Sequence, residues 1–176
     1  ATAVGNVDLD LNVTNFAAQA ANINATGVTN VASLNTLKGS TTVNGLNATT
    51  NVCVDAPGPL NINSAVSAGD TVALRSVGNL NVNAPVSAGN KISAESTSAN
   101  IQSGSNITQF SANDVALRAG DVGSAQPLTV QAQRLAAQAT TGNVQLNLTS
   151  ANTQTANLTL DKSGTLLQGV NANNGV

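Results

Sequence analysis

Two adjacent stretches of this chain repeat each other almost residue for residue. Residues 60–79 read LNINSAVSAGDTVALRSVGN, and residues 80–100, which follow with no gap, read LNVNAPVSAGNKISAESTSAN. The signature Ser67-Ala-Gly-Asp returns as Ser87-Ala-Gly-Asn and again as Ser111-Ala-Asn-Asp. A direct repeat of this length indicates one structural unit stacked on the next, because equivalent residues then meet the same surroundings.

The same period runs through the rest of the chain. Apolar residues recur every 19 to 22 residues, in the series Ile23, Val43, Ile62, Val82, Ile101, Val122 and Val144. Within a period, apolar and polar residues alternate, which predicts short half-buried strands, and Gly-Asp and Gly-Asn pairs predict turns between them. The stretch over residues 130–139 is the most helix-like, but the period continues across it, so we predict strand–turn–strand there.

The composition favours a fold with a narrow interior. Hydrophobic residues make up 41% of the chain and charged residues 8%, which is too apolar for a disordered chain. His, Trp, Tyr and Met are absent, and Phe16 and Phe110 are the only aromatic residues. No apolar run approaches the ~18 residues that cross a bilayer. A net charge of −2 gives no electrostatic basis for binding nucleic acid.

These patterns together predict an all-β fold, a parallel β-helix that spans residues 1–176 as a single segment. Each coil of about 20 residues stacks its strands on the coil below, at the strand spacing of ~4.8 Å. Equivalent side chains then form columns, and we expect amide ladders in which Asn61 lies over Asn81 and Asn63 over Asn83. Like charges repeated in every coil would be unfavourable.

The stretch from Ala65 to Asn90, AVSAGDTVALRSVGNLNVNAPVSAGN, resembles the central repeats of filamentous haemagglutinin-type exoproteins. These are the secreted partners of bacterial two-partner secretion systems, and they include adhesins and contact-dependent inhibition toxins. The resemblance is clearest over residues 60–125. It implies a right-handed parallel β-helix, export through an outer-membrane transporter, and a location outside the cell or on its surface. The family's secretion signal carries an Asn-Pro-Asn-Gly-Ile-type motif that this sequence lacks, so the chain resembles an internal piece of a longer filament.

The residues that enzymes on β-helices use are scarce. Glycosidases need two carboxylates across a cleft, and the absence of His excludes His-based triads and most zinc sites. We expect a solvated outer face at Asp8 and Asp10, with a weak cation site as the alternative, and ordinary turn residues at Asp70 and Asp114. We therefore expect no catalytic site, no metal and no cofactor. The eight acidic residues are Asp8, Asp10, Asp55, Asp70, Glu95, Asp114, Asp121 and Asp161.

Three other features have ordinary interpretations. Cys53, in Val52-Cys-Val, is expected to be a buried and inert thiol, since no basic residue is near it in the sequence. Arg75 and Arg118 share the context Ala-Leu-Arg and are expected to be exposed edge charges that discourage lateral strand pairing. Asn-x-Ser/Thr sequons occur about as often as chance would give, and they begin at Asn12, Asn24, Asn47, Asn106, Asn147 and Asn157.

Two functions from different classes fit this sequence. The first is a structural rod of a secreted filamentous adhesin or toxin-delivery exoprotein, which holds a receptor-binding or effector region away from the cell. The second is a binding module, in which one face of the rod itself contacts a host or bacterial surface. An enzyme is the least favoured class. We expect neither nucleic acid nor an inserted membrane segment among the partners.

The predicted register is tested by two neighbouring substitutions. Val82→Asp would place an unpaired charge in an inward column and should lower the free energy of unfolding by more than about 4 kcal/mol. Asn81→Asp lies on the opposite face of the same strand and should cost far less. Urea denaturation of both variants measures the difference, and equal losses would show that the register is wrong.

Overall fold

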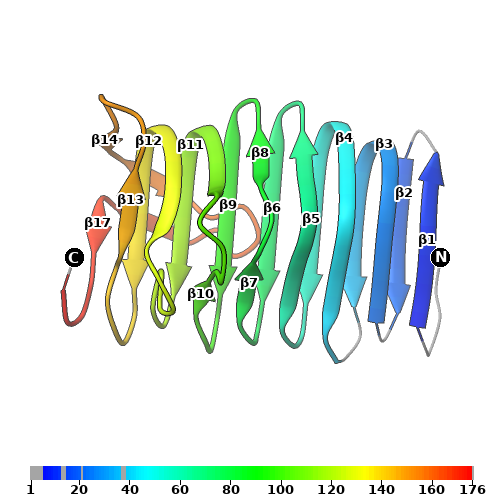
Figure 1. The fold of residues 1–176 in the computed structure, drawn as a ribbon, viewed down its shortest axis with the longest axis horizontal. Helices are drawn as coiled ribbons and strands as arrows, with labels where there is room; N and C mark the ends of the chain where they lie inside the picture. Colours follow the sequence, from blue (N-terminus) through cyan, green and yellow to red (C-terminus); the bar gives the residue numbers. More distant parts are fainter. Residues whose placement is uncertain (1–5, 13–14, 21, 37–38, 176) are drawn as a thin grey trace.

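The computed structural model describes residues 6–12, 15–20, 22–36 and 39–175 as a β-solenoid (Figure 1). All the secondary structure in this part of the chain is strand or isolated bridge, joined by turns and bends. The strands are β1 (Asn6–Asn12), β2 (Asn15–Ala20), β3 (Asn22–Thr36), β4 (Thr41–Ala56), β5 (Leu60–Ala68), β6 (Thr71–Ser76), β7 (Leu80–Val82), β8 (Val86–Ala88), β9 (Lys91–Ser96), β10 (Ile101–Gln102), β11 (Thr108–Ala119), β12 (Leu128–Ala139), β13 (Leu146–Leu148), β14 (Gln154–Thr155), β15 (Asn157–Thr159), β16 (Leu166–Gln168) and β17 (Val170–Asn171). The predicted all-β parallel solenoid is confirmed.

Each coil has three flat faces, which are separate strands in the coil of residues 80–100. We name them the β7 face, the β8 face and the β9 face after those strands. In other coils one long strand bends around a corner and covers more than one face. For example, β4 pairs with β5 through its first part and with β6 through its second part. The pairs between successive coils are parallel, so the backbone hydrogen bonds run along the axis of the rod.

The predicted columns of side chains are present, with two corrections. Val43, Ile62 and Val82 lie in register on the β7 face, as predicted. Ile101, however, lies over Leu80 and not over Val82. The predicted series therefore joined two columns that are two residues apart on one strand. The column that contains Ile101 passes through six successive coils, at Thr41, Leu60, Leu80, Ile101, Val122 and Val144.

The second correction concerns the start of the series. Ala25, and not Ile23, is the residue of β3 that lies opposite Val43. The pairing of β3 with β4 shifts register twice, so a constant period does not carry the alignment back to this coil. The strand character predicted for residues 130–139 is confirmed, but the predicted turn between two strands is not, since all of these residues belong to the single strand β12. Its alternating burial is interrupted at Gln133 and Arg134, where the chain turns from the β8 face to the β9 face.

The core is a narrow channel filled by small aliphatic side chains. Val52, Val72 and Ile92 from successive coils of the β9 face are each at most 1% exposed. Phe110 is fully buried and continues the column of Val66 and Val86 on the β8 face. Each interior side chain lies between the equivalent side chains of the coils above and below. Residues of similar volume therefore recur in the sequence at intervals of one coil. This explains why the sequence is rich in Val, Ile, Leu and Ala.

Polar side chains are buried in several coils, and one of them, Gln109, lies at a bulge. The pairing of β11 with β12 has a bulge between Thr108 and Phe110, and the extra residue, Gln109, is 1% exposed. Its amide nitrogen donates to Ser105 O at 2.7 Å and to Ser103 Oγ at 3.2 Å, while its amide oxygen accepts from Thr129 N at 2.6 Å. The side chain thus supplies the acceptor for a strand N–H at the bulge, so both ends of this buried amide are satisfied.

The glycines of the repeated signature allow two coils to approach closely at a corner. A Cβ atom placed on Gly89 would lie 2.1 Å from Gly69 O, and one placed on Gly69 would lie 2.1 Å from Thr49 O. No side chain fits at such a distance from backbone atoms. The third copy of the signature has Asn113 at this place, and its amide nitrogen donates to Gly89 O at 3.0 Å.

The last coil contains an insertion. Thr155 of β14 lies over Leu135, and Val170 of β17 lies over Ala137. Only Ala136 lies between these two positions in the coil below, so a regular coil would need one residue there. This chain has residues 156–169 instead. The inserted chain forms an antiparallel hairpin from β15 and β16, with Gly164 at positive φ in its turn. Figure 1 shows these orange strands running along the axis, across the strands of earlier coils. We call residues 156–169 the crossing hairpin.

The corner packing predicts unequal effects for two Gly→Ala substitutions. Gly89→Ala should lower the free energy of unfolding by about 1–3 kcal/mol, because two backbones must separate. Gly104→Ala should stay within about 0.5 kcal/mol, since no atom lies within 4 Å of the added Cβ. Urea denaturation of the two variants checks this, and a harmless Gly89→Ala would contradict the close approach at this corner.

Candidate functional site: a charge ladder under a crossing hairpin

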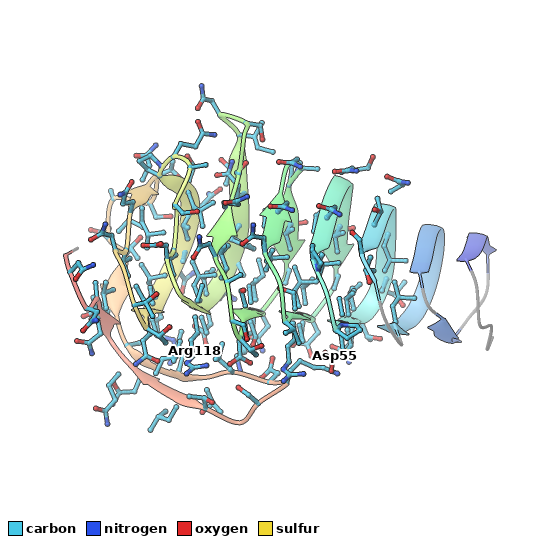
Figure 2. The ribbon with its side chains drawn as sticks, turned by 90° about the horizontal axis from the view of Figure 1, so that it is seen from below. Asp55 and Arg118 are labelled. Carbon is cyan, nitrogen blue, oxygen red and sulfur yellow. The ribbon has the colours of Figure 1, made fainter. Side chains whose placement is uncertain are left out.

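The outward side of the β9 face carries the densest polar interactions of the rod. Three outward positions alternate with the inward ones along each strand of this face, as Lys91, Ser93 and Glu95 do in β9. Stacking turns each position into a column along the axis. Figure 2 shows that Asp55 and Arg118, which belong to one of these columns, lie on the side of the rod that the crossing hairpin covers.

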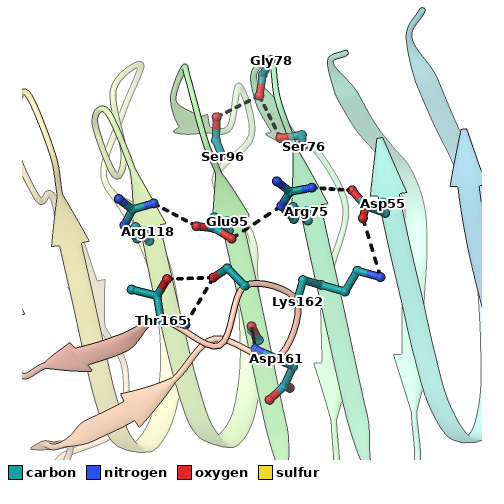
Figure 3. A network of polar contacts seen from close by, with 12 residues as sticks. Asp55, Arg75, Ser76, Gly78, Glu95, Ser96, Arg118, Asp161, Lys162 and Thr165 are labelled. Carbon is teal, nitrogen blue, oxygen red and sulfur yellow. Dashed lines mark hydrogen bonds and ion pairs between the residues drawn. The ribbon is translucent and has the colours of Figure 1, made fainter. Parts of the chain in front are cut away.

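The first column is a ladder of alternating charge. Arg75 Nη1 lies 3.2 Å from Asp55 Oδ1, and Arg75 Nε lies 3.8 Å from Glu95 Oε2. Arg118 Nη1 then lies 2.9 Å from Glu95 Oε1 (Figure 3). Arg118 Nε donates to Gln138 Oε1 at 3.1 Å. We call Asp55, Arg75, Glu95 and Arg118 the charge ladder. Since neighbours at the strand spacing have opposite signs, stacking them is favourable where like charges would repel.

Glu95 is the most enclosed member of the charge ladder. Its side chain is 3% exposed, against 33% for Arg75 and 28% for Arg118. Oε1 has the short bond from Arg118, whereas Oε2 is buried and receives no hydrogen bond from any described residue. A buried carboxylate needs compensation by nearby positive charge. The stability of this face therefore depends on the two arginines that flank Glu95.

A second outward column contains Lys91, Asp114 and Arg134 in register. Both oxygens of Asp114 accept from the guanidinium of Arg134, one of them from Nε at 2.7 Å. The hydrogen bond from this guanidinium to Asp114, together with the carboxylate charge, raises the pKa of Arg134. The signs alternate in this column as well, so the rule seen in the charge ladder holds at another position of the same strands.

The third column, between the two charged ones, has small side chains and lies beneath the crossing hairpin. It consists of Cys53, Ala73, Ser93, Ala116 and Ala136 in successive coils. Although they point away from the solenoid interior, the last two are fully buried, because Leu158, Leu160 and Leu167 of the hairpin cluster with them. Small residues leave room for a second layer on this face.

The turn of the crossing hairpin is held by charges and one backbone bond. Asp161 pairs with Lys91, and its backbone N–H donates to Ser93 Oγ at 2.9 Å. Lys162 Nζ lies 3.7 Å from Asp55 Oδ2, at the far end of the charge ladder (Figure 3). The hairpin thus connects the last coil to coils far earlier in the chain.

The remaining acids do not form a site with these columns. Asp70 is exposed at a corner, as expected for a turn residue. Asp121 belongs to another corner, where a side-chain oxygen of one coil accepts a hydrogen bond from a backbone N–H of the next. The Asn79 side chain accepts from Asn100 N, and the Asn100 side chain accepts from Asp121 N. The Asp121 side chain accepts from Asn143 N in the same way. Asp8 and Asp10 lie in β1, but their side chains are outside the described part, so neither interpretation of them is tested.

Three expectations about single residues are wrong. Asp114 is not a turn residue, because it lies in β11 and is 7% exposed. Arg75 and Arg118 are not edge charges, since β6 and β11 each have a paired strand on both sides. Cys53 is not buried in the core, because it points outward between the buried Val52 and Val54 and is partly exposed. The strands of Arg75 and Arg118 were predictable, but their partners lie in coils about 20 positions away.

The amide ladders are confirmed and extend further than predicted. Asn81 Nδ2 donates to Asn61 Oδ1 at 2.7 Å, and Asn83 Nδ2 donates to Asn63 Oδ1 at 3.4 Å. Further bonds lengthen the first ladder at both ends. We call its members the amide row, which runs through Ser40, Asn61, Asn81, Gln102 and Ser124.

The charge ladder could have been found from spacing alone, because Asp55, Arg75 and Glu95 are 20 residues apart in the repeat. The crossing hairpin has a weaker signal. Leu158 and Leu160 precede Asp-Lys-Ser-Gly and are followed by Leu166 and Leu167, a pattern that is typical of a hairpin with a four-residue turn. Nothing in these residues states which surface the hairpin covers.

Among the described residues, no group of three His, Cys, Asp or Glu side chains is arranged to hold a metal ion. The same part of the chain contains no helix of the length and hydropathy that a membrane span needs. Comparisons of the chain with protein-family models, with curated proteins and with solved structures found no match. The geometry of the site is that of paired charges under a covering hairpin.

The geometry predicts which arginine matters more to Glu95. Arg118→Ala removes the 2.9 Å partner and should lower the free energy of unfolding by about 3 kcal/mol, because it leaves a buried carboxylate short of compensation. Arg75→Ala should cost less, since its Nε lies 3.8 Å away and its side chain is more exposed.

A double-mutant cycle separates this charge effect from lost packing. In the Glu95→Gln background, Arg118→Ala should cost about 1 kcal/mol or less. Urea denaturation measures all four chains. The same cost for Arg118→Ala in both backgrounds would show that Glu95 does not depend on this partner.

Proposed function

We propose that this chain is a structural rod segment of a secreted bacterial filamentous exoprotein of the filamentous haemagglutinin type. In this role it holds a receptor-binding or effector region of an adhesin or toxin-delivery protein away from the cell surface. The role is not catalytic. The proposal combines the sequence resemblance over residues 60–125 with one structural observation, which is the unbroken bonding of coil to coil along the axis.

Axial bonding is what a rod requires. Backbone hydrogen bonds join equivalent residues of successive coils on all three faces between residues 41 and 96. The charge ladder and the amide row add side-chain bonds in the same direction. A load along the axis is therefore shared among many parallel bonds at each step, and the length grows by ~4.8 Å with each added coil.

The proposed role implies specific partners and a location outside the cell. Export would use the outer-membrane transporter of a two-partner secretion system, and the rod would act outside the cell or on its surface. A host or neighbouring-cell receptor would be contacted by other regions of the exoprotein. Nucleic acid and membrane insertion have no part in it.

The alternative is that a face of the rod binds a surface directly. The observation that favours it is the amide row, in which side-chain amides and hydroxyls repeat at regular steps on the β7 face. A recess of about 640 Å³ on another part of the surface is also lined by amides, including Asn106, Gln126 and Asn147. Both surfaces could accept hydrogen bonds from a polar polymer.

Deletion of one coil tests the rod role. Removal of residues 60–79 joins Pro59 to Leu80, and registered pairs such as Thr41 with Leu80 and Val43 with Val82 replace the lost ones. We expect a folded rod shorter by ~4.8 Å in small-angle scattering. In the full-length exoprotein, secretion and target-cell binding should stay nearly intact. Selective loss of binding by a secreted and folded variant would favour the alternative.

The charge ladder adds a second prediction for this deletion. Without Arg75, Glu95 would stack on Asp55, and the two like charges should destabilise the shortened rod. Asp55→Asn should therefore stabilise the shortened rod, although it removes an ion pair from the parent chain and destabilises that. Deletion of residues 60–68 is the control for register, because a partial coil turns apolar side chains outward and should prevent folding.

A further inference from the structure

Solenoids normally have only nearest-neighbour interactions. Each coil touches the coil above and the coil below, so a terminal coil can open without disturbing the rest. In this chain the backbone pairing obeys that rule, since every parallel pair joins a coil to the next one. The crossing hairpin departs from this rule, because its residues contact coils that are not adjacent to its own.

The base of the hairpin is part of the last coil. Thr155 and Val170, which flank it, are in register with Leu135 and Ala137. Ala156 N donates to Leu135 O at 2.9 Å and Gly169 N donates to Ala156 O at 3.0 Å, so the two ends of the hairpin are tied together at the strand. The hairpin cannot move away from its base without breaking the pairing of that coil.

The turn of the hairpin contacts coils that are far from the base. In the column that contains the charge ladder, Asn171 lies over Gln138, which is followed by Arg118, Glu95, Arg75 and Asp55. Asp161 reaches Lys91 and Ser93 in the coil of Glu95, and Lys162 reaches Asp55 itself. The hairpin therefore spans five strand spacings of the rod, and Figure 3 shows its turn lying across these strands.

Two parts of the hairpin are held by different kinds of contact. Between the base and the turn, Leu158, Leu160 and Leu167 are at most 6% exposed and cluster with Ala116 and Ala136. At the turn, the contacts are two ion pairs, whose side chains are 19–32% exposed, and the hydrogen bond from Asp161 N to Ser93 Oγ at 2.9 Å. Salt screens partly exposed pairs more strongly than apolar contacts. Attachment at the turn should therefore be weaker and more sensitive to salt than attachment through the leucines.

We propose that the crossing hairpin is a clasp that couples the opening of non-adjacent coils, so that the rod from β4 to the last coil unfolds as one unit. An isolated stack would lose its last coil first and then open coil by coil. With the hairpin in place, opening of the last coil also removes the cover from Ala116 and Ala136 and breaks the ion pairs at Lys91 and Asp55. The inference rests on the fold and does not depend on secretion or on a spacer role.

Hydrogen exchange in increasing urea, read by mass spectrometry, tests the clasp. The main variant deletes residues 156–168, which leaves Gly169 as the single residue over Ala136 and keeps the register of Thr155 and Val170. In the parent chain, we expect β6, β9, β11 and β12 to exchange through one common opening. In the deletion variant, β12 should open first. The free energy of this opening should fall with urea about half as steeply as in the parent chain, because fewer coils are exposed together.

A second pair of variants keeps the test decisive if the deletion impairs folding. Asp161→Asn with Lys162→Met removes the ion pairs at the turn and leaves the leucine contacts and the backbone hydrogen bond from residue 161 to Ser93. We expect β6 to separate from β12 in exchange while β11 and β12 stay coupled, and we expect 1 M salt to act on the parent in the same direction. Leu166→Ala is the matched control, because this residue of the hairpin is 55% exposed.

The outcomes that would overturn the clasp are distinct from those that would overturn the rod role. A parent chain whose coils exchange independently, or a deletion variant that keeps one common opening, would each refute it. An equal effect from Leu166→Ala would show that any change in the hairpin, and not its contacts with distant coils, alters exchange. None of these measurements reads cell binding or rod length.

Discussion

The parallel hydrogen bonds between equivalent residues of successive coils are the interaction on which the rest of this structure depends. They set a rise of ~4.8 Å and place each side chain next to its own equivalents, above and below. Whatever a position contains is therefore repeated at short distance along the rod. Aliphatic side chains form the interior columns, amides form the amide row, and glycines allow the corners to meet.

Charge is the property that such stacking tolerates least, and the chain accommodates it by alternation. Asp55, Arg75, Glu95 and Arg118 occupy the same position in successive coils and reverse sign at every step. The structural period is one coil, but the electrostatic period on this face is two. Removal of one coil therefore leaves the interior columns intact, but it brings like charges together in the charge ladder. A solenoid with sparse charges can still depend strongly on where they lie.

The crossing hairpin adds a second layer to a fold that is otherwise one-dimensional. It needs a floor of small outward residues, which Ser93, Ala116 and Ala136 supply, and partners for its turn, which the charged columns on either side supply. The outward surface of the β9 face thus serves two purposes, since it bonds coils to each other and receives the hairpin. The partly exposed amide row on the β7 face has no such cover among the described residues.

Much of the fold could be predicted because equivalent residues of the sequence repeat lie in register in successive coils. The strands, their parallel stacking, the columns of Ile62 with Val82 and the ladder of Asn61 with Asn81 all follow from residues 60–100, where coils of nearly equal length align without shifts. Prediction failed where a bulge or a corner changed the count. Ile101 was assigned to the wrong column for this reason, and Ile23 was misplaced by the shifts between β3 and β4.

The sequence by itself determined the period, the alternation within each strand and the residue types that stack, because these depend on local pattern and on a repeat that is visible in one dimension. Only the tertiary structure decided that Arg75 and Arg118 flank a buried Glu95, and that residues 156–169 leave the coil to cover Ala116 and Ala136. The physical reason is that these environments are built by side chains from different coils. Their distances depend on the register of the stack and on the path of one hairpin across it.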